Sequence, residues 1–222
     1  MSSVRVEEGL TKGEPVQAYV AQRTPCRIGN PGALGLFSFA STTFILSLYN
    51  LQTRGIHTPN AVVGMAIFCG GLVQLLAGMW EFPRGNAFGA TAFGSYGALW
   101  MAYTTIFIPG SRVLSAYSNE KELASALGIF LIAWFMVTFF LLIASFRKMI
   151  GLALLFAFLS LTFLLLAIAE FTGKEKVIKA GGATGAITAF IAYYVGLAGL
   201  LASEDRPVIL LPVGIFAPRK PN

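Results

Sequence analysis

The residues that could do chemistry in this chain are few and far apart. His57 is the only histidine, and the chain has ten Asp and Glu residues in all. A hydrolytic metal site needs clustered His, Cys or carboxylate ligands, and a hydroxyl nucleophile needs a nearby general base. Neither pattern occurs, so we predict that the chain is not an enzyme and that it holds no metal and no cofactor.

Two asparagines stand in patterns that could bind an anion. Asn30 is followed by Pro31, and Asn86 follows Gly85, each pair directly before an apolar run. Asn is a favoured N-cap and Pro is tolerated in the first helical turn, so both pairs predict a helix start. Unpaired N–H groups at a helix start attract carboxylates without any Lys or Arg. Simple capping is the alternative role for both asparagines.

The apolar runs behind these asparagines are long enough to cross a membrane. The chain is 56% hydrophobic and 12% charged, and its mean hydropathy is +0.72. A span needs about 20 apolar residues. Six such runs cover residues 31–49, 59–80, 87–108, 123–145, 150–171 and 180–202. We therefore predict an all-α integral membrane protein with six transmembrane helices per protomer around a narrow central pathway.

The predicted helical domain covers residues 30–202 and leaves a polar tail, 1–29, and a second tail, 203–222. Ten of the sixteen Lys and Arg residues fall in the tails and in the second and fourth loops. Because Lys and Arg concentrate on the cytosolic side, both tails are predicted to be cytosolic. Lys174, Lys176 and Lys179 in the fifth loop count against this orientation. The net charge of +6 is scattered along the chain, so no nucleic-acid partner is predicted.

The interiors of the six runs lack ionisable residues. Glu81 and Glu170 stand at the ends of two runs, and no other Asp, Glu, Lys, Arg or His lies inside them. Proton-coupled carriers commonly place such residues at mid-membrane. The two carboxylates are candidates to carry a proton, and interfacial anchoring or bonding between subunits is the alternative role for both.

Several motifs together resemble a known family. The chain has NPGALGL at residues 30–36, GGLVQ at 70–74, GNAFGATAFGSYG at 85–97, SLT at 160–162 and LPVG at 211–214. This set is similar to the acetate uptake transporter family, which includes bacterial succinate/acetate permeases and fungal acetate transporters. The resemblance covers roughly residues 30–214. It departs at Ala33, where the family usually has a second proline, and at Gly32, where a residue such as Ala is usual.

The resemblance implies six-helix protomers that assemble into a homohexamer, each with its own pathway. By motif, a narrow hydrophobic constriction of the family matches Phe39, Tyr96 and Leu161, and the motif asparagine implicated in substrate binding matches Asn30. At ~1.5 Å per residue, the three constriction residues lie about 12, 14 and 16 Å into their helices. These depths are near the middle of a ~30 Å hydrocarbon core, so the three side chains could share one layer.

We predict that the chain transports small carboxylate anions, acetate and succinate among them, as a channel or as a proton-coupled carrier in a lipid bilayer. The predicted substrate-binding residues are Asn30, Leu34, Gln74, Asn86 and Thr91. The long amino-terminal tail is similar to those of fungal family members and indicates a plasma membrane. A channel for ammonia or another small solute, and a membrane nutrient sensor without flux, are the alternatives.

Overall fold

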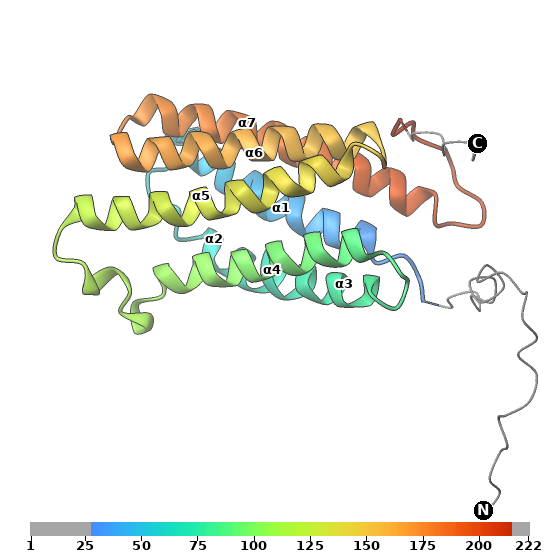
Figure 1. Cartoon of the computed structure of the whole chain (residues 1–222), viewed down its shortest axis with the longest axis horizontal. Helices are drawn as coiled ribbons and strands as arrows, with labels where there is room; N and C mark the ends of the chain where they lie inside the picture. The colour runs from blue at the N-terminus through green and yellow to red at the C-terminus, as the bar shows by residue number, and fades with distance from the viewer. Residues whose placement is uncertain (1–27, 215–222) are drawn as a thin grey trace, which may run out of the picture.

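The computed structural model describes residues 28–214, which form a bundle of long helices lying side by side (Figure 1). The predicted tail 1–29 lies outside the described residues except for its last two. Of the predicted tail 203–222, only residues 203–214 are described. The helical domain predicted for residues 30–202 therefore falls wholly within the described part.

Six helical rods run along the bundle, which confirms the fold class expected from the apolar runs. They are α1 (Gly32–Asn50), a composite second rod (Val62–Glu81), α4 (Ala87–Phe107), α5 (Glu120–Ser145), α6 (Ile150–Thr172) and α7 (Glu175–Leu201). All except α4 are long and apolar enough to cross a membrane. α4 has 21 residues and is less apolar because Gly, Ser, Thr and Tyr recur in it. Three short 3-10 turns lie in the connections: η2 (Thr53–Gly55), η4 (Pro109–Ser111) and η5 (Leu114–Ala116).

The second rod changes helical type along its length. It consists of α2 (Val62–Met65), the π-helical segment η3 (Ala66–Val73) and α3 (Gln74–Glu81). The apolar pattern does not predict this segment, because a wider turn leaves no signature in composition. α3 lies against α4 (Figure 1). A Cβ on Gly78 would come within 2.6 Å of the Gly94 backbone N. Glycine at this position therefore lets the two backbones touch, as small residues do between membrane helices.

Two helices begin earlier than their apolar runs. α5 begins at Glu120 and not at residue 123, because the Asn119 side chain accepts a hydrogen bond from the Lys121 N–H at 2.9 Å. α7 begins at Glu175 and not at residue 180, and an ion pair of 2.8 Å joins Glu175 to Lys179 one turn later. Acidic residues stabilise a first helical turn. These first turns are polar, and hydropathy alone therefore missed them.

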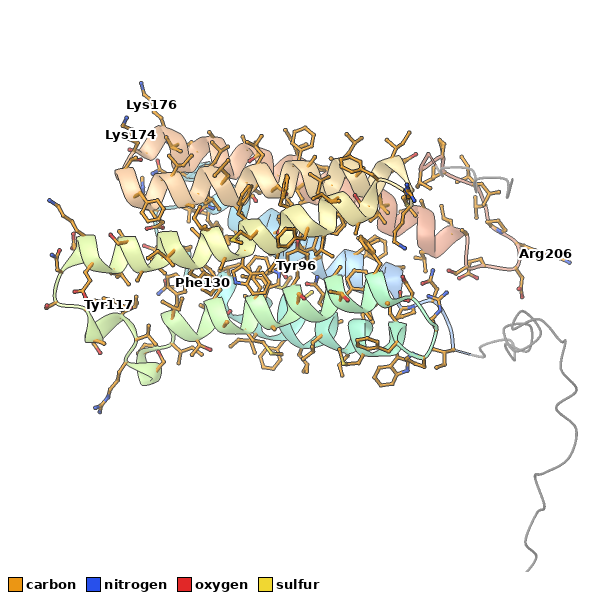
Figure 2. All side chains as sticks on the ribbon, viewed as in Figure 1. Tyr96, Tyr117, Phe130, Lys174, Lys176 and Arg206 are labelled. Carbon is orange, nitrogen blue, oxygen red and sulfur yellow. The ribbon has the colours of Figure 1, made fainter. Side chains whose placement is uncertain are left out.

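The rods pack so that a buried apolar cluster fills the centre. α1 packs on α7, α6 packs on both α5 and α7, and α4 meets α5 at only a few positions. Tyr96 lies in the middle of the bundle between α4 and α5 (Figure 2). Lys174 and Lys176 lie at one end of the bundle and Arg206 at the other. An apolar middle with charged ends is the distribution that a membrane-spanning protein requires.

Candidate functional site

Two cavities lie along the bundle, one toward each end. Cavity 1 has a volume of about 470 Å³ and reaches the end where α1 and α4 begin. Cavity 2 has a volume of about 370 Å³ and reaches the opposite end, where the loop that holds His57 lies. Phe39 lines both cavities. Phe39 therefore lies at the boundary between two spaces that reach opposite ends of the bundle.

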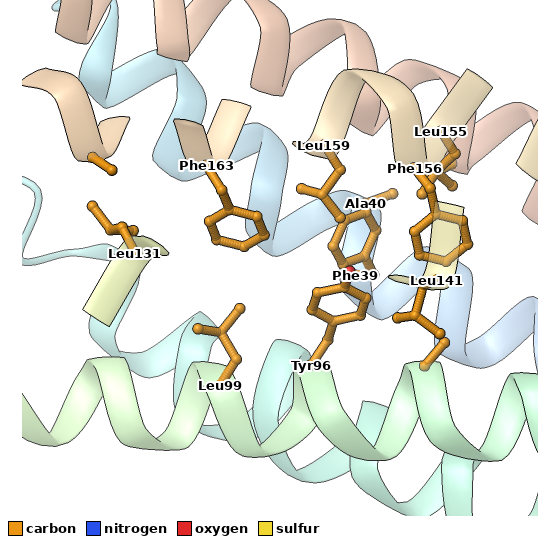
Figure 3. Packing of buried hydrophobic residues seen from close by; sticks show 13 residues of the cluster. Phe39, Ala40, Tyr96, Leu99, Leu131, Leu141, Leu155, Phe156, Leu159 and Phe163 are labelled. Atoms are coloured by element: carbon orange, nitrogen blue, oxygen red, sulfur yellow. The ribbon is translucent and has the colours of Figure 1, made fainter. Parts of the chain in front are cut away.

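An aromatic layer, defined here as Phe39, Tyr96 and Phe156, closes the bundle between the cavities. The Phe39 and Tyr96 ring centroids are 5.6 Å apart, and Tyr96 stacks on Phe156 at 6.4 Å. The Tyr96 hydroxyl shares a 2.8 Å hydrogen bond with Oγ1 of Thr138. Figure 3 shows the three rings and Leu159 gathered between α1, α4 and α6. Two residues of the predicted constriction, Phe39 and Tyr96, are therefore in contact.

Leu161 does not reach this layer. Leu161 lines neither cavity and is 42% exposed on the outside of α6, whereas Leu159 is 2% exposed and belongs to the same buried cluster as Phe39 and Tyr96. Two residues turn a helix by about 200°, so the two side chains point to opposite sides. The depth of a residue along a helix follows from the rise per residue, but the direction of its side chain depends on the rotation of the helix. The predicted placement of Leu161 is corrected to Leu159.

Three of the predicted binding residues line cavity 1: Asn30, Gln74 and Asn86. The other two do not. Leu34 is 52% exposed on the outer side of α1. Thr91 is also exposed, and its hydroxyl donates to the Ala87 carbonyl of its own helix at 2.8 Å. Leu34 and Thr91 do not line cavity 1, because both residues stand on outward faces of helices whose inward faces line the cavity.

A network of polar side chains stands at the mouth of cavity 1. Glu81 is 1% exposed, and its Oε2 accepts from Arg84 at 3.3 Å and from the Asn86 amide at 3.0 Å. Arg84 also donates to Oδ1 of Asn30 at 2.6 Å, and the Asn30 amide donates to the Ser203 hydroxyl at 3.2 Å. The network therefore ties the starts of α1 and α4 to the end of α7. The sequence hinted at this cluster through the three-residue spacing of Glu81 and Arg84, which suits an ion pair on a helix.

The two asparagines at the mouth also accept hydrogen bonds from the starts of their helices, Asn86 as the N-cap of α4 and Asn30 from the position before Pro31, the N-cap of α1. Oδ1 of Asn30 accepts from the Gly32 N–H at 3.0 Å, and Oδ1 of Asn86 accepts from the Gly89 N–H at 3.1 Å. Each helix start therefore has the predicted asparagine beside it. Asn86 has the capping role that was the alternative to substrate binding. One N–H group at each helix start is already satisfied by protein.

Deeper in the molecule, polar groups beside the aromatic layer have no partner. Both polar atoms of Gln74, which lines cavity 1, are buried and make no hydrogen bond to any described residue. On the other side of the layer, Oγ1 of Thr43 and Nε1 of Trp100 are in the same condition and line cavity 2. Buried polar groups are nearly always paired, and an unpaired one destabilises the fold by about 1–3 kcal/mol. A polar ligand passing between the cavities would satisfy them.

These features suit the passage of a small polar molecule better than catalysis. Within residues 28–214, no group of three or more His, Cys, Asp and Glu side chains could hold a metal ion. A family model described as the GPR1/FUN34/yaaH family matches residues 12–216. The chain belongs to this family.

Two fungal members of the GPR1/FUN34/yaaH family align with most of this chain. Ammonia transport outward protein 2 of Saccharomyces cerevisiae is 44% identical over 190 residues, which are 85% of this chain and 67% of that protein. Acetate permease A of Emericella nidulans is 41% identical over 201 residues, which are 86% of this chain and 67% of the permease. This chain spans about two thirds of the length of these fungal relatives.

A bacterial member gives the structural match. The succinate-acetate/proton symporter SatP of Escherichia coli is 32% identical over 188 residues, 85% of this chain and 96% of SatP. A solved structure described as the bacterial acetate channel SatP superposes with a TM-score of 0.75 at 32% identity, covering 85% of this chain and all of the other. The resemblance predicted from the motifs is confirmed, and the chain is a multi-pass membrane protein.

The path of the segment after α7 does not follow from the motifs. After α7, the segment 207–214 folds back across cavity 1, and Leu211 and Val213 line it. The Ile150 and Gly151 N–H groups donate to the carbonyls of Gly214 and Val213 at 2.8 and 3.1 Å. The LPVG motif at residues 211–214 marks this segment in the sequence, but a motif does not predict that the chain folds back there.

Proposed function

We propose that this protein conducts small carboxylates, with acetate as the principal substrate, across a membrane. The substrate enters cavity 1 past Asn30 and Asn86, crosses the aromatic layer and leaves through cavity 2, or takes the reverse path. The observation that carries this proposal is the pair of cavities that open toward opposite ends of the bundle and meet at Phe39. The names of acetate permease A and of the acetate channel SatP supply the substrate class.

The single aromatic layer suits this function for an energetic reason. Complete dehydration of an anion in an apolar medium costs tens of kcal/mol in the Born limit. A path with two cavities large enough to hold several waters and one thin apolar barrier limits dehydration to the crossing itself. Rotation of Phe39 or Tyr96, followed by wetting, is one way for such a barrier to open.

Purified protein in lipid vesicles provides the test. Radiolabelled acetate should exchange into vesicles loaded with unlabelled acetate, at a rate well above that of protein-free vesicles. Phe39→Trp should lower this protein-dependent rate at least tenfold, because the larger ring obstructs the boundary that Phe39 forms between the two cavities. Phe68→Trp is the matched control, since Phe68 lies exposed on the outside of the second rod. Exchange no faster than in protein-free vesicles under any gradient would refute the proposal.

Ammonia is the second candidate substrate, and the name of the yeast relative favours it. Acetate, succinate and ammonium should be compared as competitors in the same vesicles. If acetate transport is primary, unlabelled acetate displaces the labelled compound and ammonium at equal concentration does not. A membrane sensor without flux would bind acetate and show no counterflow.

The finer arrangement is also part of the proposal: a homohexamer in the plasma membrane with both termini in the cytosol and one pathway per protomer. Large apolar side chains on the outside of the protomer support contact with lipid or with further copies, and α5 is the least buried of the candidate spans. Native mass determination in detergent should give six protomers. Tags at both termini should be inaccessible from outside intact cells.

A further inference from the structure

The strongest unexplained group in the pathway is the Gln74 side chain. It is fully buried, and both its amide nitrogen and its carbonyl oxygen lack partners among the described residues. Gln74 directly follows the π-helical segment η3, and single π turns are frequent at functional sites. A Cβ on Gly97, the residue after Tyr96, would lie 2.7 Å from the backbone N of Leu75. Gln74 therefore lies at the level of the aromatic layer, on the side of cavity 1.

A primary amide recognises a particular form of a carboxylic acid. The amide offers N–H donors beside a carbonyl acceptor. A protonated carboxyl group offers the complement, an O–H donor beside a carbonyl acceptor, so the two can form a pair of parallel hydrogen bonds. An ionised carboxylate has acceptors only. It would satisfy the amide nitrogen of Gln74, leave the carbonyl oxygen unpaired and place two partly negative oxygens close together.

The surroundings of Gln74 also disfavour an anion. Among the described residues, no Lys, Arg or His lines cavity 1, whereas the carboxylate of Glu81 does. Arg84 is held at the rim by Glu81 and Asn30. Phe39, Tyr96 and Phe156 supply an apolar wall beside the amide. An uncharged acid loses far less hydration than an anion on entering such a place.

We propose that Gln74 binds the substrate as the neutral, protonated acid, so that the co-transported proton crosses the aromatic layer on the substrate itself. The proton comes from water at the mouth, where the carboxylate is in equilibrium with its acid, and it returns to water on the other side. This inference rests on the proposed function and removes the need for a titratable relay inside the spans. It also explains how proton coupling can coexist with helix interiors that lack ionisable residues.

Proton uptake on binding tests the inference directly. Acetate binding to the purified protein should be measured calorimetrically at pH 6.5 in buffers of different ionisation enthalpy. One proton should be taken up per acetate bound, because a carboxyl group with a pKa of about 4.3 is ionised in solution at this pH. The affinity for total acetate should fall about tenfold per pH unit above that pKa. Uptake of no proton, or an affinity that does not change with pH, would overturn the inference.

Acetamide separates recognition of the acid from any effect of pH on the protein. It is uncharged at all these pH values and presents an N–H donor beside a carbonyl acceptor. It should therefore compete with acetate, and its own affinity should stay constant between pH 5.5 and 7.5. Failure of acetamide to compete at concentrations a hundredfold above the neutral acid would contradict the proposed pairing.

Substitution of Gln74 tests whether this side chain binds the acid. Gln74→Met keeps an unbranched side chain of similar length and removes both hydrogen-bonding atoms, so binding of acetate and acetamide should weaken at least tenfold. Thr91→Val is the matched control, because Thr91 faces outward on α4 and bonds only to its own helix. Equal binding by both variants would overturn the role of Gln74. Acetate flux without proton uptake would refute this inference alone, whereas absence of flux in the parent would refute the proposed function.

Discussion

The two cavities differ in how their polar groups are arranged. At the mouth of cavity 1, Glu81, Arg84, Asn30 and Asn86 satisfy one another in one network. Cavity 2 is lined near its mouth by polar side chains such as Glu170, for which no ion pair is found within residues 28–214. Beside the aromatic layer the two sides become alike, since each has buried polar atoms without partners. Hydrogen bonds within the protein thus hold the polar side chains at the mouth of cavity 1 in place. The polar atoms beside the aromatic layer have no such bonds and are available to a ligand.

The unpaired groups on the two sides also differ in chemistry. Gln74 in cavity 1 combines donor and acceptor, whereas Trp100 in cavity 2 can only donate and Thr43 can donate or accept. Donors suit a carboxylate, and the mixed amide suits the protonated acid. A substrate that changes its protonation between the cavities would find a matching group on each side.

Joining the two cavities should have the largest effect. Leu159→Ala removes a buried side chain from the cluster around the aromatic layer, and the free energy of unfolding should fall by about 2–5 kcal/mol. The space opened beside Phe39 and Tyr96 should admit larger carboxylates at rates closer to that of acetate. Thermal unfolding in detergent and competition by longer acids in vesicles would measure the two effects.

The neighbouring substitution gives the control. Leu161→Ala changes an outward side chain of the same helix, so the free energy of unfolding should change by less than about 0.5 kcal/mol and the selectivity should stay as in the parent. The opposite ranking of these two variants would return Leu161 to the constriction and would contradict the orientation of α6.

This pair of leucines also shows what sequence reasoning could and could not reach. Six apolar runs located the six rods to within a few residues, because length and hydropathy decide what can span a membrane. Helix rotation was out of reach, since a helix apolar on all sides carries little periodicity; Leu34, Thr91 and Leu161 were therefore assigned to the wrong face. Asn30 and Asn86 were found because capping is a local property of the sequence.

Long-range contacts account for the remaining omissions. The sequence does not predict the bond from Arg84 to Asn30, because the two residues are far apart in the chain. The unpaired Trp100 and the fold-back of segment 207–214 also depend on tertiary packing. The π-helical segment before Gln74 packs closely on α4, where a Cβ on Gly71 would meet the side chain of Met101, and such packing cannot be read from composition.

Disrupting the polar network at the mouth of cavity 1 should have the next largest effect. Glu81→Gln removes the charge that faces Arg84 and weakens the bond from Asn86, so the free energy of unfolding should fall by about 2–4 kcal/mol. If the proton travels on the substrate, the pH dependence of acetate uptake should stay that of the parent. A flattened pH profile would instead identify Glu81 as a proton carrier. Glu175→Gln is the control, since its ion pair with Lys179 is exposed and the unfolding midpoint should not move.

A smaller effect is expected from removing the Thr138 hydroxyl, which is hydrogen-bonded to Tyr96 of the aromatic layer. Thr138→Val leaves the buried Tyr96 hydroxyl without a partner and should lower the free energy of unfolding by about 1–3 kcal/mol. Tyr96→Phe should have less effect, because the Thr138 hydroxyl keeps its 2.7 Å bond to the Trp134 carbonyl. The comparison of the two unfolding midpoints tests this asymmetry. Equal losses would mean that the bond between Tyr96 and Thr138 does not position the ring.

The smallest effect should come from loosening the segment that crosses cavity 1. The Tyr194 hydroxyl donates to the Pro212 carbonyl at 2.8 Å, and Tyr194→Phe removes that bond at a cost of about 0.5–1.5 kcal/mol. The Ile150 and Gly151 N–H groups, which donate to the same segment, should then exchange with deuterium faster. Amides in the middle of α6 should exchange as in the parent, because their bonds lie within the helix. If acetate exchange accelerates in the same variant, segment 207–214 restricts cavity 1; an unchanged rate would make it a structural tie alone.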